Sequence, residues 1–226
     1  PVVDNFEFTP AVLAEVRAAR NVTDIDGTRA VDLDDIRART EFEVGGPNDL
    51  DMPFRGQGTS RVEIGELDGE TVFLKTSSVV VGDNREGIRV RAEPQVINES
   101  RMSQLLEELG LGPRHYGVTT DIVDGQRRYV FVNEYVEGEH FSRLMRHVDL
   151  QVTPSMIADI RIAGQRLLAA GIDVRDPQFR LTPDGRAVLI DPEYFTFGTP
   201  GQTNAVERME AVAEQLEAIM LTQRAN

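Results

Sequence analysis

The sequence predicts an α+β protein with two parts, an antiparallel sheet in the first and mainly helices in the second. Two hairpin patterns in the first part support this, because Asp68-Gly69 and Asp124-Gly125 each separate short apolar runs. Apolar residues recur at helical spacing in the second part. With 226 residues, of which 40% are hydrophobic, the chain is long enough for one domain or for two small lobes that share an interface.

Composition and charge exclude several classes of function. The formal net charge is −14 and the basic residues are spread along the chain, so we expect no nucleic-acid partner. No apolar run approaches about 18 residues, which predicts no membrane span, and we expect no signal peptide. The absence of cysteine excludes disulfides, thiolate catalysis and cysteine-based zinc sites.

Residues 1–50 are predicted to form an accessory segment that packs on the main body or binds a partner. The segment has mixed polarity, many Asp residues and no catalytic pattern. Thr9-Pro10 is typical of a helix start, and a helix is therefore expected through Arg20. A second short helix is expected around 32–40.

Residues 51–136 are predicted to form the sheet-rich part. Gly56 and Gly58 flank a turn into a strand at 61–65, and the return strand ends in Val72-Phe73-Leu74-Lys75. A glycine pair over a hairpin lets backbone N–H groups approach phosphates, although a plain turn also fits the pattern. Since Lys75 is the only lysine in the chain and ends an apolar run, a functional role is favoured over a surface charge.

The next elements follow from helical and hairpin patterns. Pro94 is expected to open a helix that runs to about Leu109 and ends at a glycine. A hairpin is expected over 118–132, followed by a connector at 133–138 and a short helix at about 139–147.

Residues 137–226 are predicted to form the mainly helical part. Thr153-Pro154 is typical of a helix start and Gly171 of its C-terminal cap. A hairpin is expected over 179–190, and the chain then continues to a final amphipathic helix at about 204–222.

The hairpin at 179–190 is the centre of the predicted site. Antiparallel pairing brings the ends of a hairpin together, so we expect Gln178 and Asp191 to be neighbours, with Asp173 one short loop away. Amide and carboxylate oxygens that converge in this way suit Mg²⁺, which takes few protein ligands plus substrate phosphates. The alternative is a surface hairpin with acidic ends.

The order of these elements resembles that of the protein-kinase-like superfamily. Val72-Phe73-Leu74-Lys75 is similar to the family's V-A-I-K strand, and Gly56-x-Gly58 followed by Val62 resembles its nucleotide-covering loop. Glu99 lies on a helix that resembles the one carrying the glutamate partner of the lysine. Residues 133–138 resemble the hinge between the two lobes.

The second part continues the resemblance. Asp173 and Gln178 are five residues apart, as are the Asp and the Asn of the catalytic loop D-x-K-x-x-N. From Gln178 to Asp191 is 13 residues, the spacing that such kinases show before their metal-binding Asp. The resemblance covers about 54–194 and implies a two-lobed fold with an antiparallel-sheet N-lobe (51–136) and an abbreviated helical C-lobe (137–226).

Several features depart from the family pattern. The third glycine of the covering loop is missing, Gly171-Ile172 stands where His-Arg is usual, Gln178 replaces Asn, and Asp-Pro-Glu at 191–193 replaces Asp-Phe-Gly. Only 35 residues follow Asp191, too few for an activation segment and the usual helices. This short second lobe is similar to small kinases that bacterial pathogens inject into host cells. The protein is accordingly expected in the cytoplasm or inside a host cell.

The resemblance implies a role for each matching residue. Lys75 would bind the α- and β-phosphates of ATP, with Glu99 orienting it. Gly56, Gly58, Val62 and the backbone of Glu134 and Val136 would contact the nucleotide, and Gln178 and Asp191 would hold Mg²⁺. Asp173 would orient the acceptor hydroxyl, and Arg175 would neutralise charge on the transferred group.

Two of these assignments have a rival. Val174-Arg175-Asp176 mimics the His-Arg-Asp of kinases, which makes Asp176 an alternative catalytic carboxylate, although the spacings favour Asp173. Glu93 is a rival to Glu99, but it precedes the expected helix.

Three functions are compatible with the sequence. The first is an ATP- and Mg²⁺-dependent kinase, acting on a protein Ser, Thr or Tyr and serving as a bacterial effector or toxin. The second is a pseudokinase that binds a partner protein. The third is a small-molecule phosphotransferase, a class that usually needs a longer second lobe than this chain has.

Overall fold

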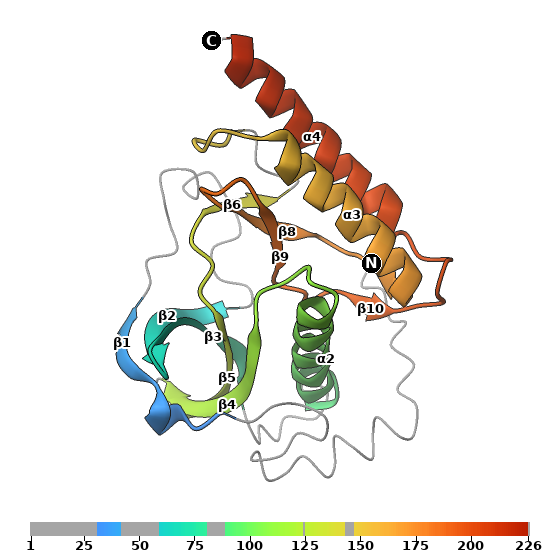
Figure 1. The fold of residues 1–226 in the computed structure, drawn as a ribbon. Helices are drawn as coiled ribbons and strands as arrows, with labels where there is room; N and C mark the ends of the chain where they lie inside the picture. Colours follow the sequence, from blue (N-terminus) through green and yellow to red (C-terminus); the bar gives the residue numbers. More distant parts are fainter. Residues whose placement is uncertain (1–30, 42–58, 81–88, 124, 143–146, 226) are drawn as a thin grey trace.

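The computed structural model of the chain describes residues 31–41, 59–80, 89–123, 125–142 and 147–225 (Figure 1). Several expectations lie outside these residues. They are the helix at about 10–20 and the glycine pair Gly56 and Gly58.

The first part of the chain forms a five-stranded antiparallel sheet with the strand order β1-β2-β3-β5-β4. Its strands are β1 (Arg37–Glu41), β2 (Thr59–Leu67), β3 (Glu70–Val80), β4 (His115–Val123) and β5 (Gln126–Glu134). The hairpins predicted from the two Asp-Gly turns are confirmed as β2–β3 and β4–β5. In the first turn, Asp68 and Gly69 have φ values of 52° and 82°, as a two-residue hairpin turn requires.

The sheet curls until its two edge strands approach each other, which gives it the ring-like outline in Figure 1. Arg39 on β1 joins these edges, because its guanidinium donates at 2.6 Å to Asp121 on β4 and at 2.6 Å to Glu63 on β2. The apolar side chains buried together in this part are Ile36, Leu67, Val72, Leu74, Val130 and Val132. Gly65 makes room for this packing, since a Cβ there would lie 2.7 Å from a methyl group of Ile36.

Strand β1 corrects the sequence analysis, which expected a short helix around 32–40. Only a single 3-10 turn, η1 (Leu33–Asp35), forms there, with Asp32 accepting a hydrogen bond from the N–H of Asp34 at 3.0 Å. The chain then pairs with β2. A neighbouring strand provides hydrogen bonds that outweigh a weak helical pattern. The sheet therefore extends into the segment that the sequence assigned as accessory.

Helix α2 (Arg89–Glu108) lies beside the sheet and is longer than expected. The sequence predicted a start at Pro94, but the helix begins more than one turn earlier. The buried residues that join the helix to the sheet are Val96, Ile97, Val118, Tyr129 and Phe131. Farther along the helix, Met102 and Leu106 belong to the core of the second part. Helix α2 therefore contacts both parts of the molecule and carries Glu99 between them.

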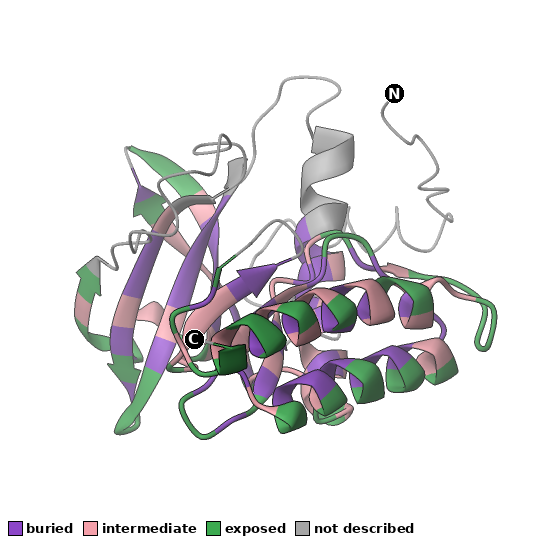
Figure 2. Ribbon diagram, turned by 90° about the horizontal axis from the view of Figure 1, so that it is seen from above, coloured by how far each residue is buried: buried purple, intermediate pink, exposed green. Residues whose placement is uncertain are grey.

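The second part combines two long helices with short strands. Helices α3 (Pro154–Ala170) and α4 (Ala205–Ala225) pack side by side (Figure 1). Strands β6 (Glu139–Ser142), β8 (Gln178–Leu181) and β9 (Ala187–Ile190) form a sheet in the order β6-β8-β9, and β7 (Ile172–Asp173) pairs with β10 (Thr196–Phe197). Figure 2 shows stripes of buried residues along both helices, as their apolar spacing predicts.

The ends of α3 form as the sequence predicts. Thr153 caps the start by accepting a hydrogen bond from the N–H of Met156 at 3.3 Å, and Gly171 ends the helix with φ at 73°. Gly164 lets α4 come close, because a Cβ there would lie 3.0 Å from Met209. The predicted hairpin at 179–190 is confirmed as β8–β9.

Strand β6 corrects the expected helix at 139–147, of which residues 143–146 lie outside the described part. Its residues pair with β8, from Glu139 opposite Leu181 to Ser142 opposite Gln178, and Phe141 is buried. The edge of β8 provides the partner that the local sequence does not reveal. With its antiparallel sheets and three α-helices in the described ranges, the protein is α+β. None of those helices is long and apolar enough to cross a membrane.

Candidate functional site

Lys75 brings together side chains from three separate elements. Its Nζ lies 2.8 Å from Oε1 of Glu99 on α2 and 2.5 Å from Oδ1 of Asp191, which directly follows β9. Glu193 adds a third carboxylate at 3.7 Å. Lys75 itself sits in the middle of the sheet, opposite Val62 on β2 and Phe131 on β5. Three residues that the sequence predicted to act together, Lys75, Glu99 and Asp191, therefore meet at one point.

Packing and a hydrogen bond hold the surroundings of these carboxylates in place. Glu99 is buried and lies two residues after Ile97, one of the apolar residues that join α2 to the sheet. Its neighbour Asn98 donates a hydrogen bond at 2.8 Å to the carbonyl of Phe195, a fully buried residue in the segment after Asp191. Helix α2 and this segment are thus connected beside the ion pairs.

Asp191 has an unusual backbone conformation. Its φ is 52°, in the left-handed region that few residues other than glycine adopt, although Asp is enriched among them. Such conformations persist only where the surrounding structure holds them, and they cluster at functional sites. Here the turn after β9 and the bond to Lys75 place the Asp191 carboxylate at the junction of the two parts.

Burial and charge shift the pKa values at this junction. Burial alone would lower the pKa of Lys75, but the carboxylates of Glu99, Asp191 and Glu193 outweigh it and raise that pKa. Burial raises the pKa of Glu99 to about 7, against the opposing effect of Lys75. Burial also raises the pKa of Glu193. Among the residues that the structure describes, Lys75 therefore faces three carboxylates, and added positive charge would be favourable here.

Gln178 lies beside the end of β9, next to Asp191, as the sequence analysis predicted. It pairs with Ile190, the residue before Asp191, so the two ends of the hairpin meet as predicted. Its Oε1 lies 3.0 Å from Nε2 of His140 on β6. Within the described ranges, no group of three or more His, Asp or Glu side chains has the arrangement of a metal site. A magnesium ion that takes Asp191 and Gln178 would rely on phosphate and water for its other ligands.

The loop between β7 and β8 holds the other predicted residues of the second part. The half-buried Asp173 accepts a hydrogen bond at 3.1 Å from the backbone N–H of Asn204, next to the start of α4. Arg175 and Asp176 are exposed. The pKa of Tyr194 is raised by burial and, to a smaller extent, by the carboxylates of Glu193, Asp191 and Asp176.

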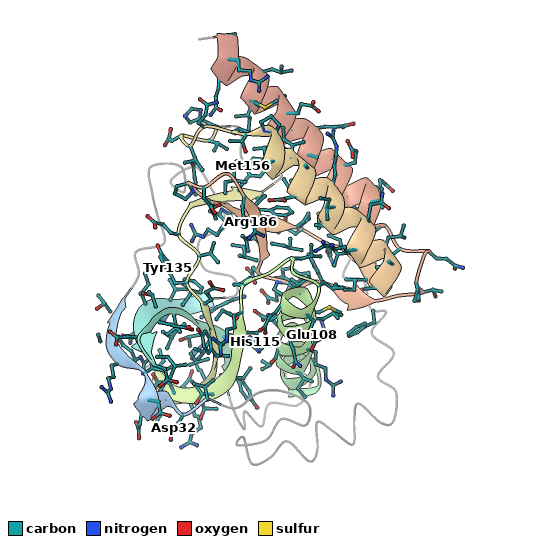
Figure 3. The ribbon with its side chains drawn as sticks, viewed as in Figure 1. Asp32, Glu108, His115, Tyr135, Met156 and Arg186 are labelled. Atoms are coloured by element: carbon teal, nitrogen blue, oxygen red, sulfur yellow. The ribbon has the colours of Figure 1, made fainter. Side chains whose placement is uncertain are left out.

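The connector between the two parts contains Tyr135 (Figure 3). Glu134 and Val136 flank Tyr135, and both were expected to present backbone groups to adenine. The N–H of Glu134 is already used, because it donates at 2.8 Å to the carbonyl of Arg114 at the start of β4. Val136 is half-buried, and Val62 is buried on β2. The expectation that Glu134 and Val136 present backbone groups to adenine stays a prediction.

A shallow depression lies on the outer side of the connector. Its lining residues are Glu70, Thr71, Arg114, Tyr116, Glu134 and Tyr135. The guanidinium of Arg114 stacks 4.6 Å from the ring centre of Tyr116, whose hydroxyl donates to Glu70. Burial, with the bond to Glu70, raises the pKa of Tyr116 to about 12. These groups therefore contact one another, and no sequence pattern predicted their arrangement.

Four residues that lie near the site were assigned no role there in the sequence analysis. Glu193 had a signal, because it stands two residues after Asp191 in the Asp-Pro-Glu sequence, but it was noted only as a departure from Asp-Phe-Gly. Asn98, His140 and Asn204 gave none, since their contacts depend on chain segments far away in sequence. No protein-family model matches the chain, and no curated protein matches its sequence.

Proposed function

We propose that this protein is a protein-kinase-like phosphotransferase that moves the γ-phosphoryl group of ATP to a hydroxyl of a protein Ser, Thr or Tyr. The observation that carries the proposal is the meeting of Lys75, Glu99 and Asp191 within hydrogen-bond distance, from a sheet, a helix and the end of a hairpin. In phosphoryl transfer of this kind, catalysis is mainly positioning and electrostatic stabilisation, which is what such a junction provides.

Lys75 and Glu99 would act on the nucleotide. A lysine held by a buried glutamate is fixed in position and fully charged, and so suits the phosphates of ATP. Val62, opposite Lys75 on β2, would contact the adenine or ribose from the sheet side. The backbone of Val136 in the connector would provide hydrogen bonds to the adenine.

Asp191 and Gln178 would bind Mg²⁺, which neutralises charge on the β- and γ-phosphates. The excess of carboxylate over ammonium at the junction supports this role, because a divalent cation would relieve it. The His140 contact to Gln178 would orient the amide whose oxygen serves as a ligand.

The transfer itself makes one bond and breaks one. The acceptor oxygen bonds to the γ-phosphorus, the bond from that phosphorus to the β,γ-bridging oxygen breaks, and ADP leaves with the electron pair. The hydroxyl proton is released. A carboxylate on the loop between β7 and β8 would orient the hydroxyl, and the exposed Arg175 would face the transferred group.

A second candidate function is a pseudokinase that binds a protein without phosphoryl transfer. One contact favours it: the carboxylate of Asp173, which the spacing favoured as the acceptor-orienting group, accepts a hydrogen bond from the start of α4. The two candidates differ in a measurable way, since only the first requires phosphate transfer that depends on Mg²⁺.

The test is phosphate transfer from labelled ATP with Mg²⁺, using the purified protein alone and with a eukaryotic and a bacterial lysate. Lys75→Ala and Asp191→Ala should abolish labelling. Arg161→Ala is the matched control, because Arg161 also pairs with two carboxylates, Glu210 and Glu217, but on the exposed surface of α3 and α4.

The outcomes separate the candidates. Labelled protein bands that are lost in both site variants and kept in Arg161→Ala support the kinase, and the lysate that holds them identifies a host or a bacterial acceptor. Binding of MgATP without transfer to any protein supports the pseudokinase. Absence of both transfer and MgATP binding would rule out the proposed function.

A further inference from the structure

The loop between β7 and β8 carries two carboxylates, Asp173 and Asp176, in different surroundings. Asp173 ends β7 and pairs with Thr196 on β10. One of its oxygens accepts a hydrogen bond at 3.1 Å from the backbone N–H of Asn204. The other lies so close to Gly198 that a Cβ there would approach it to 2.5 Å. The carboxylate is therefore enclosed by the segment that leads into α4.

Asn204 also links this loop to α4 through its side chain, and the hydrogen bonds between Asn204 and the loop are called the joint below. Its side-chain oxygen accepts at 2.7 Å from the N–H of Val174, and its side-chain nitrogen donates at 3.1 Å to the Val174 carbonyl. Together with the bond to Asp173, three hydrogen bonds connect two adjacent residues of the loop to a single residue. A negative charge at the start of a helix is also favoured by the helix dipole. Asp173 thus has the contacts of a residue that fixes the loop.

Asp176, unlike Asp173, is exposed to solvent. Its φ is 53°, and the residue after it, Pro177, is buried. A backbone in this sparsely populated region is typical of functional sites. The pKa of Tyr194, which burial raises, is raised further by the carboxylates of Glu193, Asp191 and Asp176. Asp176 is therefore an accessible carboxylate whose charge acts on the segment that follows Asp191.

We propose that Asp176 orients the acceptor hydroxyl in phosphoryl transfer, and that Asp173 is a positioning residue that fastens the loop to the start of α4. This assignment rests on the proposed function and reverses the one that the sequence spacing favours. In the transfer described above, Asp176 accepts the hydrogen bond of the acceptor hydroxyl and aims its oxygen at the γ-phosphorus. Asp173 touches neither substrate and acts through Asn204 and the loop backbone.

The test compares Asp173→Asn with Asp176→Asn in the full chain. Asparagine at 173 keeps an oxygen that accepts from the Asn204 N–H, so transfer should stay within about threefold of the unaltered protein. Asparagine at 176 removes the carboxylate, so transfer should fall by about 100-fold or more, with MgATP binding unchanged. Asp173→Ala and Asn204→Ala break the joint, and both should lower the thermal unfolding midpoint and the transfer rate.

Rescue by the conservative variant is the decisive readout. The proposal is supported when Asp173→Asn restores both the unfolding midpoint and the transfer that Asp173→Ala loses. It is overturned when Asp173→Asn loses transfer as fully as Asp176→Asn does, or when Asp176→Asn keeps the unaltered rate. Absence of transfer in the unaltered protein would overturn the proposed function and this assignment with it, and the unaltered sample alone reveals that outcome.

Discussion

Glu99 and Lys75 form an ion pair with 2.8 Å between Oε1 and Nζ, and their side chains are only 8% and 11% exposed. The pair joins α2 to the centre of the sheet. A buried ion pair must overcome the loss of hydration of both charges, so its presence alone does not imply stability. It does make the position of α2 sensitive to the ionisation of Glu99, which leads to the first prediction.

The free energy of unfolding should contain a contribution from Glu99 that is lost as pH rises. Burial raises the pKa of Glu99 to about 7 from an ordinary value of 4.5, so the folded protein binds this proton more tightly than the unfolded chain. The contribution is full below about pH 4.5 and is lost as pH rises through about 7, with a size of about 3 kcal/mol. Glu99→Gln cannot titrate and should lack it. Urea unfolding of both proteins between about pH 4.5 and 8 measures the difference.

A control separates this effect from that of other carboxylates. Glu66→Gln changes an exposed carboxylate on β2 and should leave the pH dependence as it is in the unaltered protein. A stability difference between the unaltered protein and Glu99→Gln that stays constant with pH would contradict the prediction.

Lys75→Met should destabilise the protein most at alkaline pH. The change leaves Glu99, Asp191 and Glu193 together without their cation, and breaking a buried pair costs about 3–5 kcal/mol. At about pH 5 the deficit should shrink, because neighbouring carboxylates take up protons more readily when they repel one another. Urea unfolding at about pH 5 and 8 tests this. Arg161→Met, at an exposed ion pair, should leave the midpoint nearly unchanged at both values.

Much of the fold was predictable because its signals are local. Asp68-Gly69 specifies a hairpin turn, and Thr153 and Gly171 specify the two ends of a helix, without reference to the rest of the chain. Strands β1 and β6 were not predictable, since each forms only by pairing with a strand distant in sequence. The same limit applies to the site. Lys75, Glu99 and Asp191 were suggested by motif spacing, whereas the joint between Asp173 and Asn204 depends on where the last helix packs.

Arg39→Ala should open the curl of the five-stranded sheet. Arg39 links β1 and β2 to β4, and its loss removes one of two arginine partners from the buried Glu63. Hydrogen bonds to charged groups contribute about 1.5–3 kcal/mol each, so a loss of about 2 kcal/mol in the free energy of unfolding is expected. Chemical denaturation measures it. Arg37→Ala, at an exposed position on the same strand, should have little effect, and equal losses for the two variants would contradict this role for Arg39.

Gly138→Ala should destabilise the passage from the connector into β6. Gly138 has a φ of 149°, and a Cβ there would lie 2.2 Å from the carbonyl oxygen of Leu181, a clash with backbone that no side-chain rotation relieves. A loss of more than about 2 kcal/mol is expected. Gly125→Ala is the control for a positive φ, because its φ of 73° also disfavours a side chain but no atom lies within 4 Å of the added Cβ. Thermal unfolding should rank Gly138→Ala well below Gly125→Ala, and the reverse order would refute the clash.

His115→Leu should loosen α2 from the sheet. His115 is fully buried between them (Figure 3), with Nε2 at 2.8 Å from Oγ of Ser100 on α2 and Nδ1 at 2.7 Å from Oδ1 of Asn133 on β5. Leucine fills a similar space but leaves both partners without this bond, which should lower the free energy of unfolding by about 2–4 kcal/mol.

Two comparisons identify the cause of that loss. His147→Leu alters an exposed histidine that pairs with Asp149, and it should leave the unfolding midpoint unchanged. The double variant Ser100→Ala, His115→Leu should lose less free energy of unfolding than the sum of the losses in the two single variants. Residues of one hydrogen-bond network share their energy. Since Ser100 follows Glu99 directly on α2, His115→Leu should also weaken MgATP binding, as measured by calorimetry. Strictly additive losses would show that Ser100 and His115 stabilise the protein independently.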